Sequence, residues 1–287
     1  MYMKMITKLI AGVLTLSVSI CLGQTPRKAE DFYQRGLVRQ EQGDVDGAIA
    51  DFNKAIELYP KYSSAYTSRA AAKKAKGDIE GAIADFGRAI ELTPEIAVPY
   101  YQRGFVFLEK QDFDAAIKDF DKALELQPEL AIVYNNRGDA KRGKGNLAAA
   151  ISDYTRAIEN KPNFIEAYHS RAAARFTEGD LAGALADYSK VIELDPQNAD
   201  AYYNRGSLRQ SKDDLEGAIA DFNKAIELNP QYAEAYADRG LARLSLGLDA
   251  EAQKDFDKYL ELDKTMKASL EQRIKYVKYQ RDKKRKS

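Results

Sequence analysis

Apolar residues recur along the chain at the spacing of an amphipathic helix, and a stretch near the N-terminus shows the pattern clearly. Its apolar positions are Val45, Ala48, Ile49, Phe52, Ala55 and Ile56. Intervals of three and four residues place them on one face of a helix, so this face is expected to be buried. Gly43 is suited to end a preceding helix, Asp44 to cap the new one, and Pro60 to stop it. The pattern predicts two helices joined by a short turn.

The same pattern returns every 34 residues. The prolines that end it are Pro60, Pro94, Pro128, Pro162, Pro196 and Pro230. With each proline at position 32, the chain divides into seven units: 29–62, 63–96, 97–130, 131–164, 165–198, 199–232 and 233–266. A constant period of this length indicates a repeat architecture, in which each helical hairpin buries its apolar face against its neighbours.

Position 8 of every unit is small, and it lies inside the first predicted helix. The residues are Gly36, Ala70, Gly104, Gly138, Ala172, Gly206 and Gly240. A glycine inside a helix costs about 1 kcal/mol relative to alanine. Its recurrence therefore predicts a close helix contact that leaves no room for a larger side chain.

These features resemble the tetratricopeptide repeat family over residues 29–266. Besides the small position 8, the units have Ala at position 20, Phe or Tyr at position 24, and in most units Ala at 27 and Pro at 32. The resemblance implies an all-α solenoid, a right-handed superhelix of helical hairpins. It also implies a concave groove lined by positions 2, 5, 9 and 12 of each first helix. Members of the family are non-enzymatic scaffolds for protein interaction, and that is the function expected here.

The chain departs from the family pattern in its charges. Position 7 is always arginine: Arg35, Arg69, Arg103, Arg137, Arg171, Arg205 and Arg239. Position 23 is always aspartate: Asp51, Asp85, Asp119, Asp153, Asp187, Asp221 and Asp255. Position 11, on the same helix face as position 7, is basic in every unit except the third, which has Phe107. We predict that each aspartate pairs with a position-7 arginine, which gives an Arg–Asp ladder that specifies how the helices dock.

The family's groove positions give the candidate binding residues. In the third unit they are all apolar: Val98, Tyr101, Phe105 and Leu108, with Ile132 adjoining from the next unit. Further candidates in other units are Tyr33, Asn135, His169 and Tyr203. An apolar row in a groove favours docking of a peptide or protein segment. Two alternatives stay open, namely self-association through the same surface and binding of an envelope glycan on Tyr33, Tyr101 and Tyr203.

The residue inventory argues against catalysis. The chain has one histidine, His169, and one cysteine, Cys21, so it cannot build a disulfide framework, a Cys/His zinc site or a cysteine–histidine dyad. Neither a glycine-rich phosphate loop nor a nucleophile elbow occurs in the sequence. A lone histidine in the groove is interpreted as a contact residue. The sequence therefore predicts neither an enzyme nor a cofactor nor a metal.

The N-terminus has the pattern of a secretory signal. Lys4 and Lys8 precede an apolar stretch over residues 9–23, which is short for a membrane-spanning helix. We expect cleavage after Gly23, a short linker over residues 24–28, and a secreted or periplasmic protein without a membrane span. Retention of the segment as an anchor and lipid attachment at Cys21 stay open as alternatives.

The C-terminus is basic although the whole chain is neutral. The sequence has 44 basic and 44 acidic residues, yet residues 267–287 hold nine Lys or Arg and two acids. Met266, Leu270, Ile274 and Val277 form an apolar stripe, which predicts a helix that caps the last repeat. The basic tail is a candidate for weak contact with an anionic surface. Nucleic acid is not an expected partner of a secreted protein.

Overall fold

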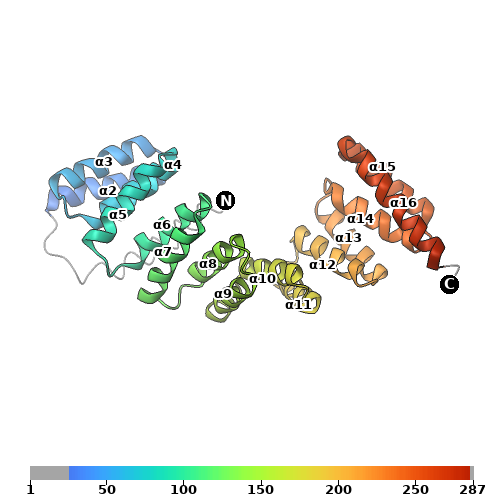
Figure 1. Ribbon diagram of the computed structural model, residues 1–287. Coiled ribbons are helices and arrows are strands. Elements are labelled where there is room, and N and C mark those ends of the chain that lie inside the picture. The colour runs from blue at the N-terminus through green and yellow to red at the C-terminus, as the bar shows by residue number, and fades with distance from the viewer. Residues whose placement is uncertain (1–25, 285–287) are drawn as a thin grey trace. The chain divides into compact units, whose positions relative to one another are not determined.

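The computed structural model describes residues 26–284, and every regular element within that range is a helix (Figure 1). The helices belong to two compact units, residues 1–128 and 129–287. Both units are built from tandem helical hairpins, which confirms the expected all-α repeat fold. The predicted signal peptide, residues 1–23 with Cys21, lies outside the described residues.

The first unit contains three hairpins, and each hairpin falls within one 34-residue repeat. The pairs are α2 (Arg27–Glu41) with α3 (Val45–Leu58), α4 (Ser63–Lys76) with α5 (Ile79–Leu92), and α6 (Ala97–Glu109) with α7 (Phe113–Leu126). The second helix of each of the first two hairpins also packs against the first helix of the next, α3 against α4 and α5 against α6. The repeats thus share a continuous core.

The second unit contains four hairpins and a final helix. The pairs are α8 (Ala131–Gly143) with α9 (Leu147–Asn160), α10 (Ile165–Glu178) with α11 (Leu181–Leu194), α12 (Ala199–Ser211) with α13 (Leu215–Leu228), and α14 (Ala233–Ser245) with α15 (Asp249–Leu262). A short 3-10 turn, η2 (Lys264–Met266), leads into α16 (Lys267–Lys284). The helix α16 packs against α14, the first helix of the last repeat.

The turn inside each hairpin follows from its sequence. In six repeats an Asp or Asn side chain accepts a hydrogen bond from the third backbone N–H of the second helix, as Asp44 does from Gly47 at 2.9 Å. Four of these repeats, and the seventh, place glycine in the left-handed conformation just before the N-cap residue of the second helix. The other two place Gln111 and Asp213 there, with φ of 60° and 63°. These two side chains therefore impose backbone strain.

The small residue at position 8 lies against the aromatic residue at position 24, as its recurrence predicted. A Cβ atom added to Gly36 would lie 2.6 Å from the ring of Phe52, and one added to Gly138 would lie 2.6 Å from Tyr154. Both rings are fully buried. This contact fixes the spacing of the two helices within each hairpin.

The predicted Arg–Asp ladder is confirmed in all seven repeats. Each arginine donates two parallel hydrogen bonds to its aspartate, with Nη2–Oδ1 distances of 2.6–2.8 Å and Nε–Oδ2 distances of 2.8–3.1 Å. The aspartates are only 3–5% exposed. In six repeats the basic residue at position 11 lies 2.7–3.0 Å from the same carboxylate. Two cations on one carboxylate compensate for its burial, and the pKa of Asp51 is correspondingly lowered, chiefly by hydrogen bonds from Arg35.

The ladder also connects consecutive repeats. The remaining nitrogen of several arginines donates to position 25 of the preceding repeat, as in the bond from Arg69 to Asn53 at 2.7 Å and that from Arg171 to Thr155 at 3.0 Å. Most of these guanidinium groups also lie over the aromatic ring at position 4, which adds a cation–π contact. One side chain therefore ties together three helices.

The helix α16 caps the last repeat through one face. Leu270 is buried, and Ile274 and Val277 pack half-buried against the core of that repeat. Met266 was expected in the same stripe, but it is 44% exposed because it belongs to the 3-10 turn before the helix. Arg281 belongs to the basic C-terminal stretch, and it donates to the Leu244 carbonyl at 3.1 Å and to Asp249 at 2.6 Å. Arg281 therefore helps to hold α16 in place.

Candidate binding groove

The first unit carries the apolar row on α6. Val98, Tyr101, Phe105 and Leu108 occur at groove positions of that helix, and all four are half-buried. The Phe105 ring lies 4.3 Å from the Lys74 ammonium, which in turn pairs with Glu109 at 2.7 Å. The row therefore keeps some apolar surface with a charged pair at its edge. Ile132 belongs to the second unit, where it packs against the cluster around Phe164 and Ala167.

Tyr33 offers little surface to a ligand. It is 7% exposed, because its ring lies 4.9 Å from that of Tyr62 and 5.9 Å from that of Phe52. The Tyr62 hydroxyl donates to Glu30 at 2.5 Å, which holds the pair of rings in place. Burial raises the pKa of both tyrosines. Stacking of a sugar on Tyr33 would require this packing to open.

The groove of the second unit begins with a polar cluster on α8. Asn135 is 6% exposed, and its amide donates to Asp139 at 3.3 Å. Asp139 also accepts a hydrogen bond from the Tyr154 hydroxyl at 2.8 Å, and burial raises the pKa of this carboxyl. Asn135 is thus too deeply buried to offer much surface to a ligand.

His169 occupies a groove position of α10. Burial lowers its pKa, although the nearby Asp200 carboxylate acts in the opposite direction. One ring nitrogen is 3.4 Å from the Asn204 amide, and the ring stands edge-on to Tyr188 at 5.5 Å between centroids. No second catalytic group is positioned for proton transfer with this ring among the contacts described, so the geometry fits a contact residue.

Tyr203, at a groove position of α12, is half-buried. Its ring lies 4.8 Å from that of Tyr232, and its hydroxyl donates to Asp238 at 2.9 Å. Asp238 also accepts a hydrogen bond from Arg273 of α16. The capping helix is therefore joined to the groove wall through Asp238. A cavity of about 400 Å³ lies beside this junction, lined by Gln210, Leu241, Gln272, Arg273, Tyr276 and Val277.

A contact rule emerges that the sequence analysis missed. A residue at position 5 meets position 6 of the following repeat, 35 residues later, in Tyr33–Ser68, His169–Asn204 and Tyr203–Asp238. The polar residues at position 6 were a visible signal for this pairing. Their partners became clear only when the helices of adjacent repeats were seen side by side. Position 5 is therefore partly committed to the groove wall.

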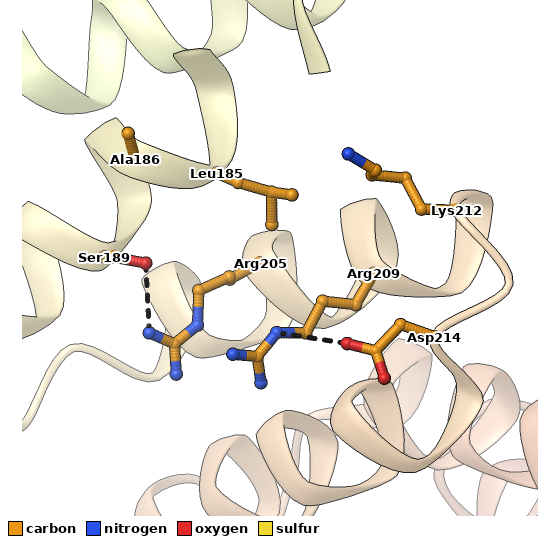
Figure 2. A pocket seen from close by; sticks show the side chains of 7 residues that line it. All are labelled: Leu185, Ala186, Ser189, Arg205, Arg209, Lys212 and Asp214. Atoms are coloured by element: carbon orange, nitrogen blue, oxygen red, sulfur yellow. Dashed lines mark hydrogen bonds and ion pairs between the residues drawn. The ribbon is translucent and has the colours of Figure 1, made fainter. Parts of the chain in front are cut away.

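A second cavity, of about 340 Å³, lies on the side of the helices that carries the ladder (Figure 2). It is lined by Leu185, Ala186, Ser189, Arg205, Arg209, Lys212 and Asp214. Arg205 donates to Ser189 at 3.2 Å, and Arg209 lies 3.7 Å from Asp214. Both arginines also bind Asp221, so their donors are committed to the fold.

Among residues 26–284, no three His, Cys, Asp or Glu side chains are grouped so that they could hold a metal ion. Within the same range no helix has the length and apolar character needed to cross a membrane.

Comparison with known proteins identifies the class. Models of the tetratricopeptide repeat match residues 29–62, 97–130, 131–164, 199–232 and 233–266, and a related TPR repeat model matches 72–111 and 174–213. The chain therefore belongs to the tetratricopeptide repeat family, whose members are generally non-catalytic interaction scaffolds.

Solved structures show the same fold. MamA is 29% identical, with a TM-score of 0.56, over 61% of this chain and 95% of that one. YrrB, described as a TPR protein with an unusual peptide-binding site, is 30% identical, with a TM-score of 0.56, over 64% of this chain and 95% of that one. A TPR protein from Cytophaga hutchinsonii has a TM-score of 0.72 at 18% identity, over 83% of this chain and 98% of that one.

One curated relative, the uncharacterized protein MJ0572 of Methanocaldococcus jannaschii, is 48% identical over 40 residues. The match covers 14% of this chain and 46% of that protein, so it spans about half of the relative's length. It carries no information on a partner.

Proposed function

We propose that this chain binds a peptide or a segment of another protein on α6, centred on Tyr101, Phe105 and Leu108. The observation that carries the proposal is the unbroken apolar row at the groove positions of the third repeat. The corresponding positions of repeats five and six include His169 and Asp200, so they are more polar. Apolar and aromatic side chains supply most of the energy in such grooves. The peptide-binding site described for YrrB supports this use of the fold.

The test is a pull-down from extract of the source organism with wild-type protein and a Phe105→Asp/Leu108→Asp variant. A matched control is Leu58→Asp/Leu248→Asp, which introduces the same charges at residues that are 37% and 43% exposed outside the groove positions. Thermal unfolding first establishes that both variants are folded. We expect a partner that the wild type and the control retain and the groove variant loses.

Other results would redirect the proposal. Equal capture by both variants would place the binding surface elsewhere and refute a site on α6. If no partner is captured, light scattering separates self-association, in which the mass is a multiple of the monomer, from glycan binding, which leaves a monomer. Glycan binding would have to use Tyr101 and Tyr203, because Tyr33 is buried.

We also propose that the chain is exported and that the N-terminal segment is removed after Gly23. The basis is the sequence of residues 1–23, with its lysines followed by a short apolar stretch. Mass spectrometry of the protein from its own cells should give an N-terminus at Gln24. An intact N-terminus would instead indicate a retained anchor, and a lipid-modified Cys21 would indicate a lipoprotein.

A further inference from the structure

The exposed side of α16 carries two tyrosines, one of which, Tyr276, also lines the cavity beside Leu241. Tyr276 is 63% exposed and Tyr279 is 64% exposed. The opposite face of the helix, with Leu270 buried and Val277 half-buried, is held against the last repeat. The tyrosines are thus presented to solvent by a helix whose position is fixed. Large exposed aromatic side chains grouped in this way mark an interaction surface.

Lysines surround the two rings. Lys275, Tyr279 and Lys283 follow one another at intervals of four residues, so they lie along one line of the helix. Lys275, Lys278 and Lys283 are exposed, and no ion pair joins any of them to another described residue. The two arginines of the helix differ, because Arg273 and Arg281 pair with Asp238 and Asp249. Two exposed carboxylates, Glu271 and Asp282, lie on the same side of the helix, four residues from Lys275 and from Lys278. The positive charge left for a partner is therefore mainly that of Lys275 and Lys283, on either side of Tyr279 along the helix.

We propose that this face, formed by Lys275, Tyr276, Lys278, Tyr279 and Lys283, binds an anionic lipid surface. A tyrosine ring is apolar while its hydroxyl is polar, so it suits the boundary between headgroups and acyl chains. Lysines beside it gain from the negative surface potential of anionic lipids. A soluble polyanion would be held by the lysines alone and would leave the exposed rings without a role. The groove on α6 belongs to the other unit, so the two activities are separable.

The test uses co-sedimentation with vesicles of phosphatidylcholine alone or mixed with phosphatidylglycerol. The protein spans residues 24–287, which omits the apolar N-terminal segment and keeps every residue that the structure describes. We expect binding only to the mixed vesicles, with a loss at high salt, because the Debye length falls to about 3 Å at 1 M. Lys275→Gln/Lys283→Gln should lower the partition coefficient about thirtyfold.

Two further variants make the test specific. Lys118→Gln/Lys254→Gln removes the same charge from exposed positions on α7 and α15 and should bind as the wild type does. Tyr279→Ser leaves the charge unchanged and should weaken binding, because the ring no longer enters the interface. Equal losses in both lysine variants, or full binding by Tyr279→Ser, would refute a specific lipid-binding face. Binding of soluble polyglutamate without binding of vesicles would instead indicate an acidic polymer as the partner.

Discussion

The Arg–Asp ladder gives the sharpest prediction of stability. Asp187 accepts hydrogen bonds from Arg171 at 2.9 and 2.7 Å and from Arg175 at 2.7 Å, and it is 3% exposed. Asp187→Asn keeps the shape of the side chain but removes the charge and turns one acceptor into a donor. The two guanidinium groups then face an uncharged amide, and its NH2 group is a donor that would point at their N–H donors. The substitution therefore leaves the arginines uncompensated.

The magnitude depends on how many cations lose their partner. Removing one member of a buried ion pair costs about 3–5 kcal/mol. The side chains of Arg171 and Arg175 are 12% and 23% exposed, so water compensates them in part. We expect a loss of about 3 kcal/mol for Asp187→Asn. Asp119 pairs with one arginine, Arg103, because position 11 of that repeat is Phe107. Asp119→Asn should therefore lower the free energy of unfolding by less, about 2 kcal/mol.

Urea denaturation followed by circular dichroism measures these losses. In the third repeat, Asp119→Leu and Arg103→Met can be combined in a double-mutant cycle. Replacing both partners by apolar side chains should recover most of the stability that Asp119→Leu loses, because no charge is left buried alone. Losses below about 1 kcal/mol for both Asp187→Asn and Asp119→Asn would show that the ladder behaves like exposed surface pairs and would refute the reasoning.

Three further predictions concern single positions. Gln111→Gly should stabilise the protein by about 0.5 kcal/mol, because glycine adopts the left-handed conformation without strain. Asp213→Gly should stabilise it by less, and a lower melting temperature in either variant would contradict this prediction. Gly138→Val should lower the free energy of unfolding by about 1–3 kcal/mol, because the new side chain would clash with the Tyr154 ring. Gly138→Ala should lower it by less, since two repeats carry alanine at this position. Urea midpoints equal to that of the wild type would contradict the close packing. Burial raises the pKa of Tyr188 to about 12, whereas a tyrosine in the unfolded chain titrates at about 10. The unfolded chain therefore loses this proton first, and the stability that the neutral ring contributes is lost as the pH rises from about 10. Tyr188→Phe should reduce this decline of the melting temperature at alkaline pH.

The sequence by itself determined the repeated hairpin and its internal contacts. The stripe containing Phe52, the cap at Asp44 and the small residue at Gly36 recur at a fixed period, and each acts within one hairpin. The pairing of Arg35 with Asp51 was predictable for the same reason, since a constant separation of 16 residues gives the same geometry in every repeat. A repeating sequence pattern predicts such contacts because equivalent residues make the same contacts in every repeat.

Only the tertiary structure decided which side chains the groove leaves accessible. Tyr33 and Tyr203 occupy equivalent positions, and each ring contacts the equivalent pair of rings in its own repeat. Tyr33 is nevertheless buried and Tyr203 half-buried, and their hydrogen-bond partners in the next repeat differ, Ser68 for Tyr33 and Asp238 for Tyr203. The capping helix shows the same limit, since Arg281 reaches Asp249 across 32 residues and Tyr279 faces solvent. Contacts between non-equivalent residues have no period, so they follow from the packed helices and not from the repeat pattern.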